Sequence, residues 1–170
     1  MDSQRSVHGM FLAGATAACF VSMVTLTQAG DWARFRGPNG TGISADSDPL
    51  PTTFSETENL KWKVALPGAG VSCPIVVGDK VFVTCYSGYG ADPQNRGEMK
   101  DLKRHLICID RETGKTLWEK IVEAVLPEDE YTGPGVDQHG YASHTPVSDG
   151  KNVYVFYGKS GVLAYTVYGE

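Results

Sequence analysis

From residue 74 onward, short apolar stretches rich in β-branched and aromatic residues alternate with turn sequences. We expect strands at 74–77, 80–86, 105–110 and 115–122, with turns at 78–79 and 111–114. Apolar residues occupy both alternations of these strands, which predicts sheets buried on both faces.

The pattern then recurs. Pro74-x3-Gly78-x2-Val81-Phe82-Val83 matches Pro146-x3-Gly150-x2-Val153-Tyr154-Val155 without a gap, and Trp62 and Trp118 lie 56 residues apart. Four-stranded units that repeat radially are the blades of a β-propeller. The sequence therefore predicts an all-β fold, a β-propeller of four-stranded antiparallel blades, with about two blades in this chain. We place an N-terminal arm at 30–60, a first blade at 61–122 and an incomplete second blade at 123–170.

The segment from Cys108 to Trp118 resembles the tryptophan-docking motif of pyrroloquinoline-quinone-like propellers, Ala-x-Asp-x-x-Thr-Gly-x-x-x-Trp. Asp110, Thr113, Gly114 and Trp118 match it at the motif's spacing, and Cys108 replaces the usual Ala. In physical terms, Gly114 supplies a positive φ, Asp110 accepts turn hydrogen bonds, and Trp118 packs on a neighbouring blade. The stretch 31–40 also resembles the arm that opens many bacterial members.

The last unit departs from this motif. Thr166 stands where Asp belongs, Gly169 comes one position early, and no Trp follows. A propeller needs at least about four blades to close. We therefore expect this chain to be an N-terminal part that requires the remaining blades.

The N-terminus has the layout of a secretory signal. Arg5 precedes an apolar run over 9–26, and Thr27-Gln28-Ala29 places small residues at a cleavage site. We expect residues 1–29 to be removed, which locates the mature protein, without a transmembrane span, in the periplasm or cell envelope. Two alternatives stay open: a retained membrane anchor, and lipid attachment at Cys19.

Charge and cysteine content limit the function classes. The net charge of −5 and the absence of a basic run argue against nucleic-acid binding. Export would leave Cys73, Cys85 and Cys108. Cys85 and Cys108 would lie on neighbouring strands, where a disulfide is the alternative, but buried free thiols are the favoured interpretation.

The resemblance implies one of two activities. Dehydrogenases of this family hold pyrroloquinoline quinone and calcium, with an adjacent-cysteine ring and a catalytic Asp, whereas the outer-membrane assembly scaffolds bind protein partners with the same blades. This chain has no adjacent cysteines, and no carboxylate matches the catalytic Asp. We therefore predict a scaffold without catalytic residues or cofactor. The alternative is the N-terminal part of a quinoprotein alcohol or sugar dehydrogenase.

Strand order predicts where a partner binds. The connections 87–104 and 123–143 are both long and should lie on the same face, opposite the tight turns. Their aromatic and charged residues are the candidate site: Tyr89, Asp92, Arg96, Arg104, Tyr131, Asp137, His139 and Tyr141. The alternative is that both loops are tolerated surface insertions. Asp137, His139 and His144 match no tight metal spacing, so we predict no metal site. The acidic stretch 123–130 is expected to be solvated.

Overall fold

The computed structural model describes residues 30–45, 49–92, 94–132 and 136–170, with the side chains of 136 and 137 excepted. The expectations for export, cleavage and lipid attachment concern residues 1–29, which lie outside these ranges. No helix in the described part of the chain is long and apolar enough to cross a membrane.

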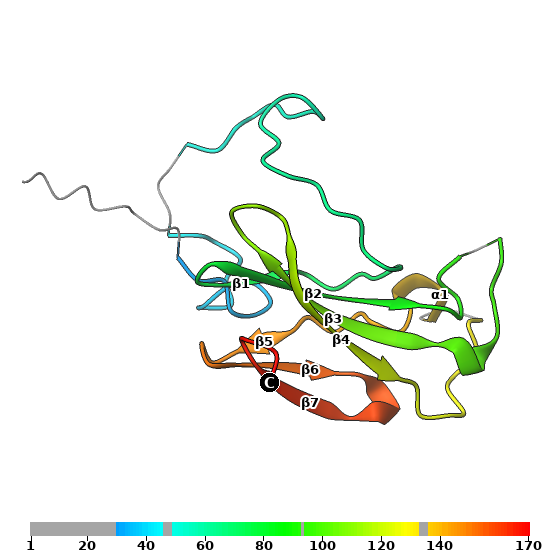
Figure 1. Ribbon diagram of the computed structural model, residues 1–170. Helices are drawn as coiled ribbons and strands as arrows, with labels where there is room; N and C mark the ends of the chain where they lie inside the picture. Colours follow the sequence, from blue (N-terminus) through cyan, green and yellow to red (C-terminus); the bar gives the residue numbers. More distant parts are fainter. Residues whose placement is uncertain (1–29, 46–48, 93, 133–135) are drawn as a thin grey trace, which may run out of the picture.

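The fold is all-β, as predicted, and consists of two antiparallel sheets (Figure 1). The first sheet has the order β1 (Ile75–Val77), β2 (Lys80–Ser87), β3 (Lys103–Asp110) and β4 (Thr116–Glu123). The second has the order β5 (Val147–Ser148), β6 (Asn152–Phe156) and β7 (Val162–Thr166). Three single turns of helix complete the description: η1 (Met99–Asp101), α1 (Val136–His139) and η2 (Gly158–Ser160).

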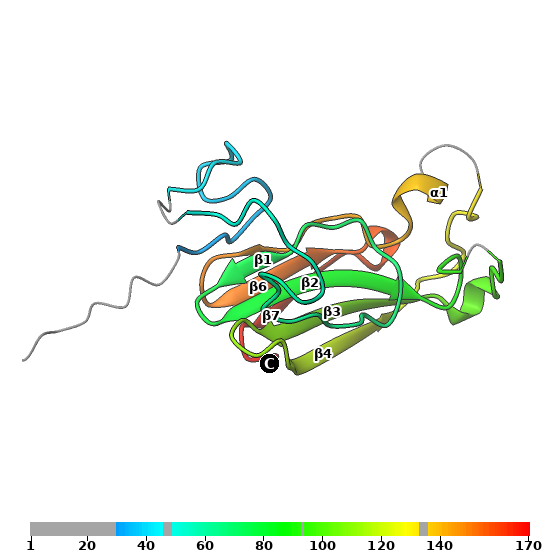
Figure 2. The ribbon, with the colours of Figure 1, turned by 90° about the horizontal axis from the view of Figure 1, so that it is seen from above.

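The sheets stack face to face, and the main core lies between them (Figures 1 and 2). Phe82, Leu106 and Cys108 of the first sheet meet Val153 and Val155 of the second. On its other face the first sheet buries Cys85, Ile107 and Ile109 against Trp62, Val64 and Leu66. Strands β2 and β3 are thus buried on both faces, as their apolar residues predicted. For β4 that prediction is wrong, because its residues alternate between exposed and half-buried positions.

The two strand cysteines are free and buried on opposite faces of the sheet. Cys85 pairs with His105 and Cys108 pairs with Phe82, three positions apart in the register. Residues an odd number of positions apart on a strand face opposite sides, so a bridge between these thiols is ruled out by the pleat. The favoured interpretation, buried free thiols, is confirmed.

These thiols should resist alkylation in the folded protein. Burial raises the pKa of Cys85 to about 11 and that of Cys108 to about 12. The thiolate is the reactive form, so at pH 8 both remain protonated as well as shielded. We expect a maleimide to modify exposed Cys73 rapidly and the other two only after unfolding, as measured by peptide mass spectrometry. Equal labelling of all three in the native protein would contradict this burial.

The tryptophan-docking residues have the geometry that their spacing predicted. Thr113 donates both its backbone N–H and its hydroxyl to Oδ1 of Asp110, each at 2.7 Å. These bonds lower the pKa of Asp110, with the Thr113 side chain as the largest cause. Gly114 has a φ of 72°, and a Cβ there would lie 2.7 Å from the Trp62 ring. The turn is therefore a built platform on which a tryptophan rests.

Trp118 rests on the corresponding turn of the second sheet. Its ring lies over Gly169, and Nε1 donates to the Val167 carbonyl at 3.2 Å. That turn closes without the Asp: the N–H of Thr166 donates to the carbonyl of Glu170, and the Thr166 hydroxyl accepts from the N–H of Glu170. The departure from the motif therefore leaves the docking contact intact.

The arm joins the two sheets at their shortest strands. Trp32 forms a two-way backbone bridge with Val76 of β1, and the carbonyl of Ala33 accepts from Ser148 of β5. A carboxylate oxygen of Asp31 accepts from the N–H of Gly78. Residues 31–33 thus fasten the strands that start each sheet.

Candidate interaction site at the long loops

The two long connections meet at one end of the sheets, as predicted. Residues 88–102 join β2 to β3, and residues 124–146 join β4 to β5. The second connection contains α1, and both lie at the end opposite the hairpin turn between β3 and β4 and the C-terminus (Figure 1). This placement follows from the alternating strand directions. In an antiparallel sheet, the connections β1–β2 and β3–β4 lie at one end, and the connections β2–β3 and β4–β5 lie at the other.

Four tyrosines form the core of this loop layer. Tyr141 lies at the centre, with ring centroids 5.5 Å from Tyr86, 5.9 Å from Tyr89 and 6.1 Å from Tyr131. The Tyr89 hydroxyl accepts from the N–H of Tyr131, and the Tyr86 hydroxyl donates to the carbonyl of Gly90. Burial raises the pKa of Tyr86 and of Tyr141. The rings stay neutral and hold the two loops together.

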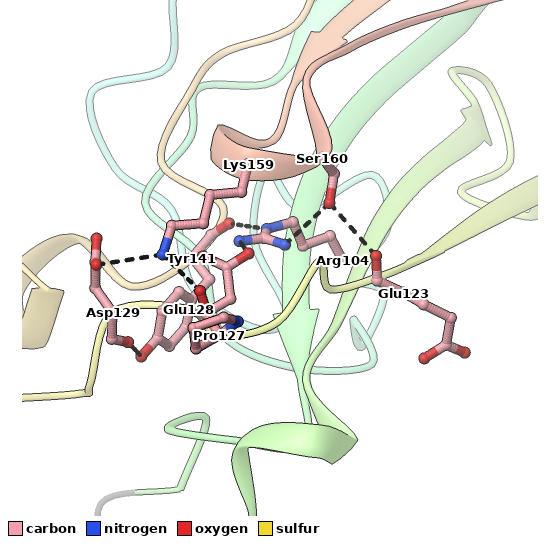
Figure 3. A network of polar contacts seen from close by, with 8 residues as sticks. All are labelled: Arg104, Glu123, Pro127, Glu128, Asp129, Tyr141, Lys159 and Ser160. Carbon is pink, nitrogen blue, oxygen red and sulfur yellow. Dashed lines mark hydrogen bonds and ion pairs between the residues drawn. The ribbon is translucent and has the colours of Figure 1, made fainter.

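Arg104 ties the crossing loop to the first sheet (Figure 3). Its Nη2 donates to Oε1 of Glu128 at 2.7 Å, and Nε donates to the carbonyl of Tyr141 at 3.0 Å. The side chains of Arg104 and Glu128 are only 3% and 5% exposed. A buried charge needs a partner, and this pair supplies one to each side chain.

The same network reaches the second sheet through η2 (Figure 3). Nζ of Lys159 donates to the Pro127 carbonyl at 2.5 Å and lies 3.6 Å from Oδ1 of Asp129. The Ser160 hydroxyl donates to the carbonyl of Glu123 at 3.4 Å. Residues 123–129 are therefore bonded to Arg104 of the first sheet and to η2, which joins the last two strands of the second sheet.

Two expectations from the sequence need correction here. Tyr89 and Arg104 are buried, so they organise the loops from within and do not contribute to an exposed surface. Glu128 is also buried, in its pair with Arg104, so the acidic stretch is not solvated throughout. In both cases a charged or polar residue next to a turn was expected to be exposed. The residue that buries it lies far along the chain and could not be identified from the local sequence.

The outward side of the layer carries the predicted residues that are exposed, whereas Tyr131 and Tyr141 are half-buried. Asp92 and Arg96 are exposed on the first loop, and the Arg96 guanidinium lies 5.9 Å from the Tyr131 ring centroid. His139 is exposed at the end of α1, and the Asp137 side chain is outside the described part. A hollow of about 150 Å³ lies among these elements, lined by Val71, Tyr86, Tyr131 and His139 together with Ala69, Gly70, Gln138 and Gly140.

The site offers charged and aromatic contacts on a fixed support. His144 packs edge-on against Phe156, with ring centroids 4.7 Å apart, whereas His139 is exposed. Within the described ranges, no three His, Cys, Asp or Glu side chains gather as metal ligands would.

Comparison with known proteins assigns no family. No protein-family model matches the chain, and no curated protein matches it. Function is therefore inferred from the geometry.

One buried polar group was not predicted from the sequence. His105 of β3 lies 2.7 Å from the Ser87 hydroxyl through Nε2 and 2.6 Å from Glu119 through Nδ1. The three residues come from β2, β3 and β4, so the imidazole links three strands within the sheet. Its signal was a histidine in an otherwise apolar strand with polar residues on both neighbouring strands.

Proposed function

We propose that this protein is an exported β-propeller scaffold of the periplasm or cell envelope, which binds a protein partner through the loop end without catalysis. The stacked antiparallel sheets support the propeller, and so does the tryptophan contact made in the same way by Trp62 and Trp118. The repeated contact indicates sheets added by one rotation, as successive blades are.

The observation that carries the binding role is the set of contacts within the loop layer. The described residues of the two insertions, which are far longer than the turns at the other end, are joined by a tyrosine cluster and a buried ion pair. A fixed surface loses little conformational entropy on binding, which favours affinity. Asp92, Arg96, Tyr131 and His139 are the contact groups we assign to it.

The quinoprotein alternative finds no support in these residues. Calcium takes six to eight oxygen ligands in proteins. Within the described ranges no three His, Cys, Asp or Glu side chains gather as ligands, and the sequence has no adjacent cysteines. The quinoprotein dehydrogenase therefore stays the second candidate, and no catalytic step is derived through a cofactor.

The test changes three exposed loop residues together: Asp92→Ala, Arg96→Ala and His139→Ala. We expect quantitative capture of the partner from a periplasmic extract to fall at least tenfold, because an acid, a base and a ring are removed from the contact surface. The matched control removes an acid, a base and a ring at the tight-turn end: Glu112→Ala, Lys115→Ala and Tyr168→Ala.

Circular dichroism should show both triple variants folded. Unchanged capture by the loop variant, together with loss in the control, would place the binding site at the opposite end of the sheets.

A further inference from the structure

The imidazole of His105 joins a hydroxyl and a carboxylate through its two ring nitrogens. Nε2 lies 2.7 Å from Oγ of Ser87, and Nδ1 lies 2.6 Å from Oε1 of Glu119. An ionised carboxylate only accepts hydrogen bonds, so Nδ1 carries the hydrogen, and in the neutral ring Nε2 accepts from the Ser87 hydroxyl. A hydroxyl, a base and an acid that orients the base are therefore connected in the order of a serine-hydrolase triad.

The register of the first sheet brings the three residues together. Ser87 of β2 lies opposite Lys103, two positions from His105, and Glu119 of β4 lies opposite Ile107, also two positions from His105. Residues two positions apart share a face of a sheet, and diagonal neighbours on adjacent strands are within reach of long side chains. The three side chains thus lie on the face that buries Ile107, away from the second sheet.

Exposure differs among these residues in a way that suits a reaction at the hydroxyl. The side chain of His105 is 5% exposed, so water competes little for its bonds, whereas Ser87 and Glu119 are only half-buried. The next residue, Gly88, is exposed, and no described group accepts a hydrogen bond from its N–H. The N–H of the residue after the nucleophile is one of the donors that stabilise the oxyanion in serine hydrolases.

A hollow of about 240 Å³ adjoins the three residues on the same face. Its lining is mostly apolar and consists of Ala65, Leu66, Pro67, Ile107, Thr116 and Glu119. Glu119 belongs both to this lining and to the hydrogen-bonded set. The chain that forms the apolar wall continues past the nucleophile, since a Cβ added to Gly68 would lie 3.2 Å from Cα of Ser87. Apolar walls with a few polar groups are typical of small-molecule sites, and these walls suit an alkyl group.

We propose that Ser87, His105 and Glu119 form a reactive-serine site that transfers the acyl group of a short-chain carboxylic ester to water. Oγ of Ser87 forms a bond to the ester carbonyl carbon while its proton passes to Nε2 of His105. The bond between that carbon and the leaving oxygen then breaks, and the leaving oxygen takes the proton from Nε2. Glu119 keeps the ring oriented and stabilises its cationic form.

The second half of the reaction restores the serine. Water attacks the acyl carbon and gives a proton to Nε2 of His105. The bond from the acyl carbon to Oγ of Ser87 breaks, the carboxylic acid leaves, and the proton returns from Nε2 to Oγ. This activity goes beyond the proposed partner binding. None of the three residues is among the contact groups assigned to the loop end, so either role can fail without the other.

A fluorophosphonate probe tests the serine directly on the full chain. Oγ of Ser87 would form a bond to phosphorus as the bond from phosphorus to fluorine breaks, with fluoride leaving and the proton passing through His105 to water. We expect one adduct, located at Ser87 by peptide mass spectrometry, and its loss in Ser87→Ala. The matched control is Ser72→Ala, because half-buried Ser72 donates its hydroxyl to the Thr84 carbonyl at 3.1 Å instead of to a base. That control should leave the labelling unchanged.

The base and the acid are tested by the rate of the reaction. His105→Gln and Glu119→Gln should each slow the labelling of Ser87 at least tenfold, and the hydrolysis of p-nitrophenyl butyrate should fall in parallel. Circular dichroism should show each variant folded, and the wild-type chain unfolded in urea should not be labelled. A purely structural set would leave these rates unchanged in a folded variant.

Two results would overturn the proposal. One is the absence of an adduct at Ser87 in the folded wild-type chain, and the other is an equal labelling rate in the wild type and in Glu119→Gln. Because Glu119 is partly exposed, its variant keeps the test decisive if the buried substitution His105→Gln prevents folding.

Discussion

Replacing Arg104 by alanine is expected to lower the free energy of unfolding by about 3–5 kcal/mol, because it leaves the buried carboxylate of Glu128 without its partner. Glu128→Gln should also destabilise, since the guanidinium then loses its ionic partner. Urea unfolding followed by circular dichroism measures both. The effect is large because water cannot reach either group to replace the lost interaction.

The matched control is an ion pair on the surface. Lys61 and Glu112 lie 2.5 Å apart but are 57% and 78% exposed, so Lys61→Ala should cost about 0–1 kcal/mol. The double variant Arg104→Met with Glu128→Leu should be more stable than either single variant, because no buried charge is left unpaired. A cost below about 1 kcal/mol for Arg104→Ala would mean that the pair is solvated.

The strands could be predicted because their signal is local. Apolar alternation between turn residues placed the strands of the first sheet within a few positions of those observed, and hairpin parity placed both long loops at one end. The docking residues were also readable, since Asp110, Thr113 and Gly114 bond within one turn. Where all partners of a contact lie within a few residues of one another, the local sequence is sufficient to predict the contact.

The interior of the site could not be predicted, because its contacts join distant residues. Glu128 lies in an acidic stretch that is typical of solvent, and only its approach to Arg104, 24 residues away, buries it. Tyr89 and Tyr141 were predicted on the same face, but Tyr89 packs into the tyrosine cluster and is buried. A clue was present for Arg104: it stands in β3 among residues that are buried on both faces.

The loop layer contains both buried and exposed residues, which bears on the binding role proposed for it. Its buried members hold the loops together, and under the proposed function its exposed members would make the contacts with a partner. Half-buried Tyr131 belongs to both groups. A substitution that disorders the tyrosine cluster should therefore weaken partner capture without touching an exposed contact group. Gly140 is the position chosen for this test, because a side chain there would press on the Tyr86 ring.

Gly140→Ala is expected to lower the free energy of unfolding by about 2–5 kcal/mol. Its φ is 61°, which costs about 1–2 kcal/mol for a residue with a Cβ, and that Cβ would lie 2.2 Å from the Tyr86 ring. Overpacking the buried cluster adds about 1–3 kcal/mol. The shifted rings should reduce the near-ultraviolet circular dichroism of the tyrosines and the capture of the partner.

Gly150→Ala is the control, because Gly150 also has a positive φ, of 90°, but nothing lies within 4 Å of its Cβ position. It should cost only the backbone strain of about 1–2 kcal/mol and leave the tyrosine signal and partner capture unchanged. The difference between the two variants isolates the contact with Tyr86 from the strain that they share. Equal losses of stability, with equal capture, would contradict both expectations. They would show that the tyrosine cluster accommodates the added methyl group without loss of stability and does not position the binding surface.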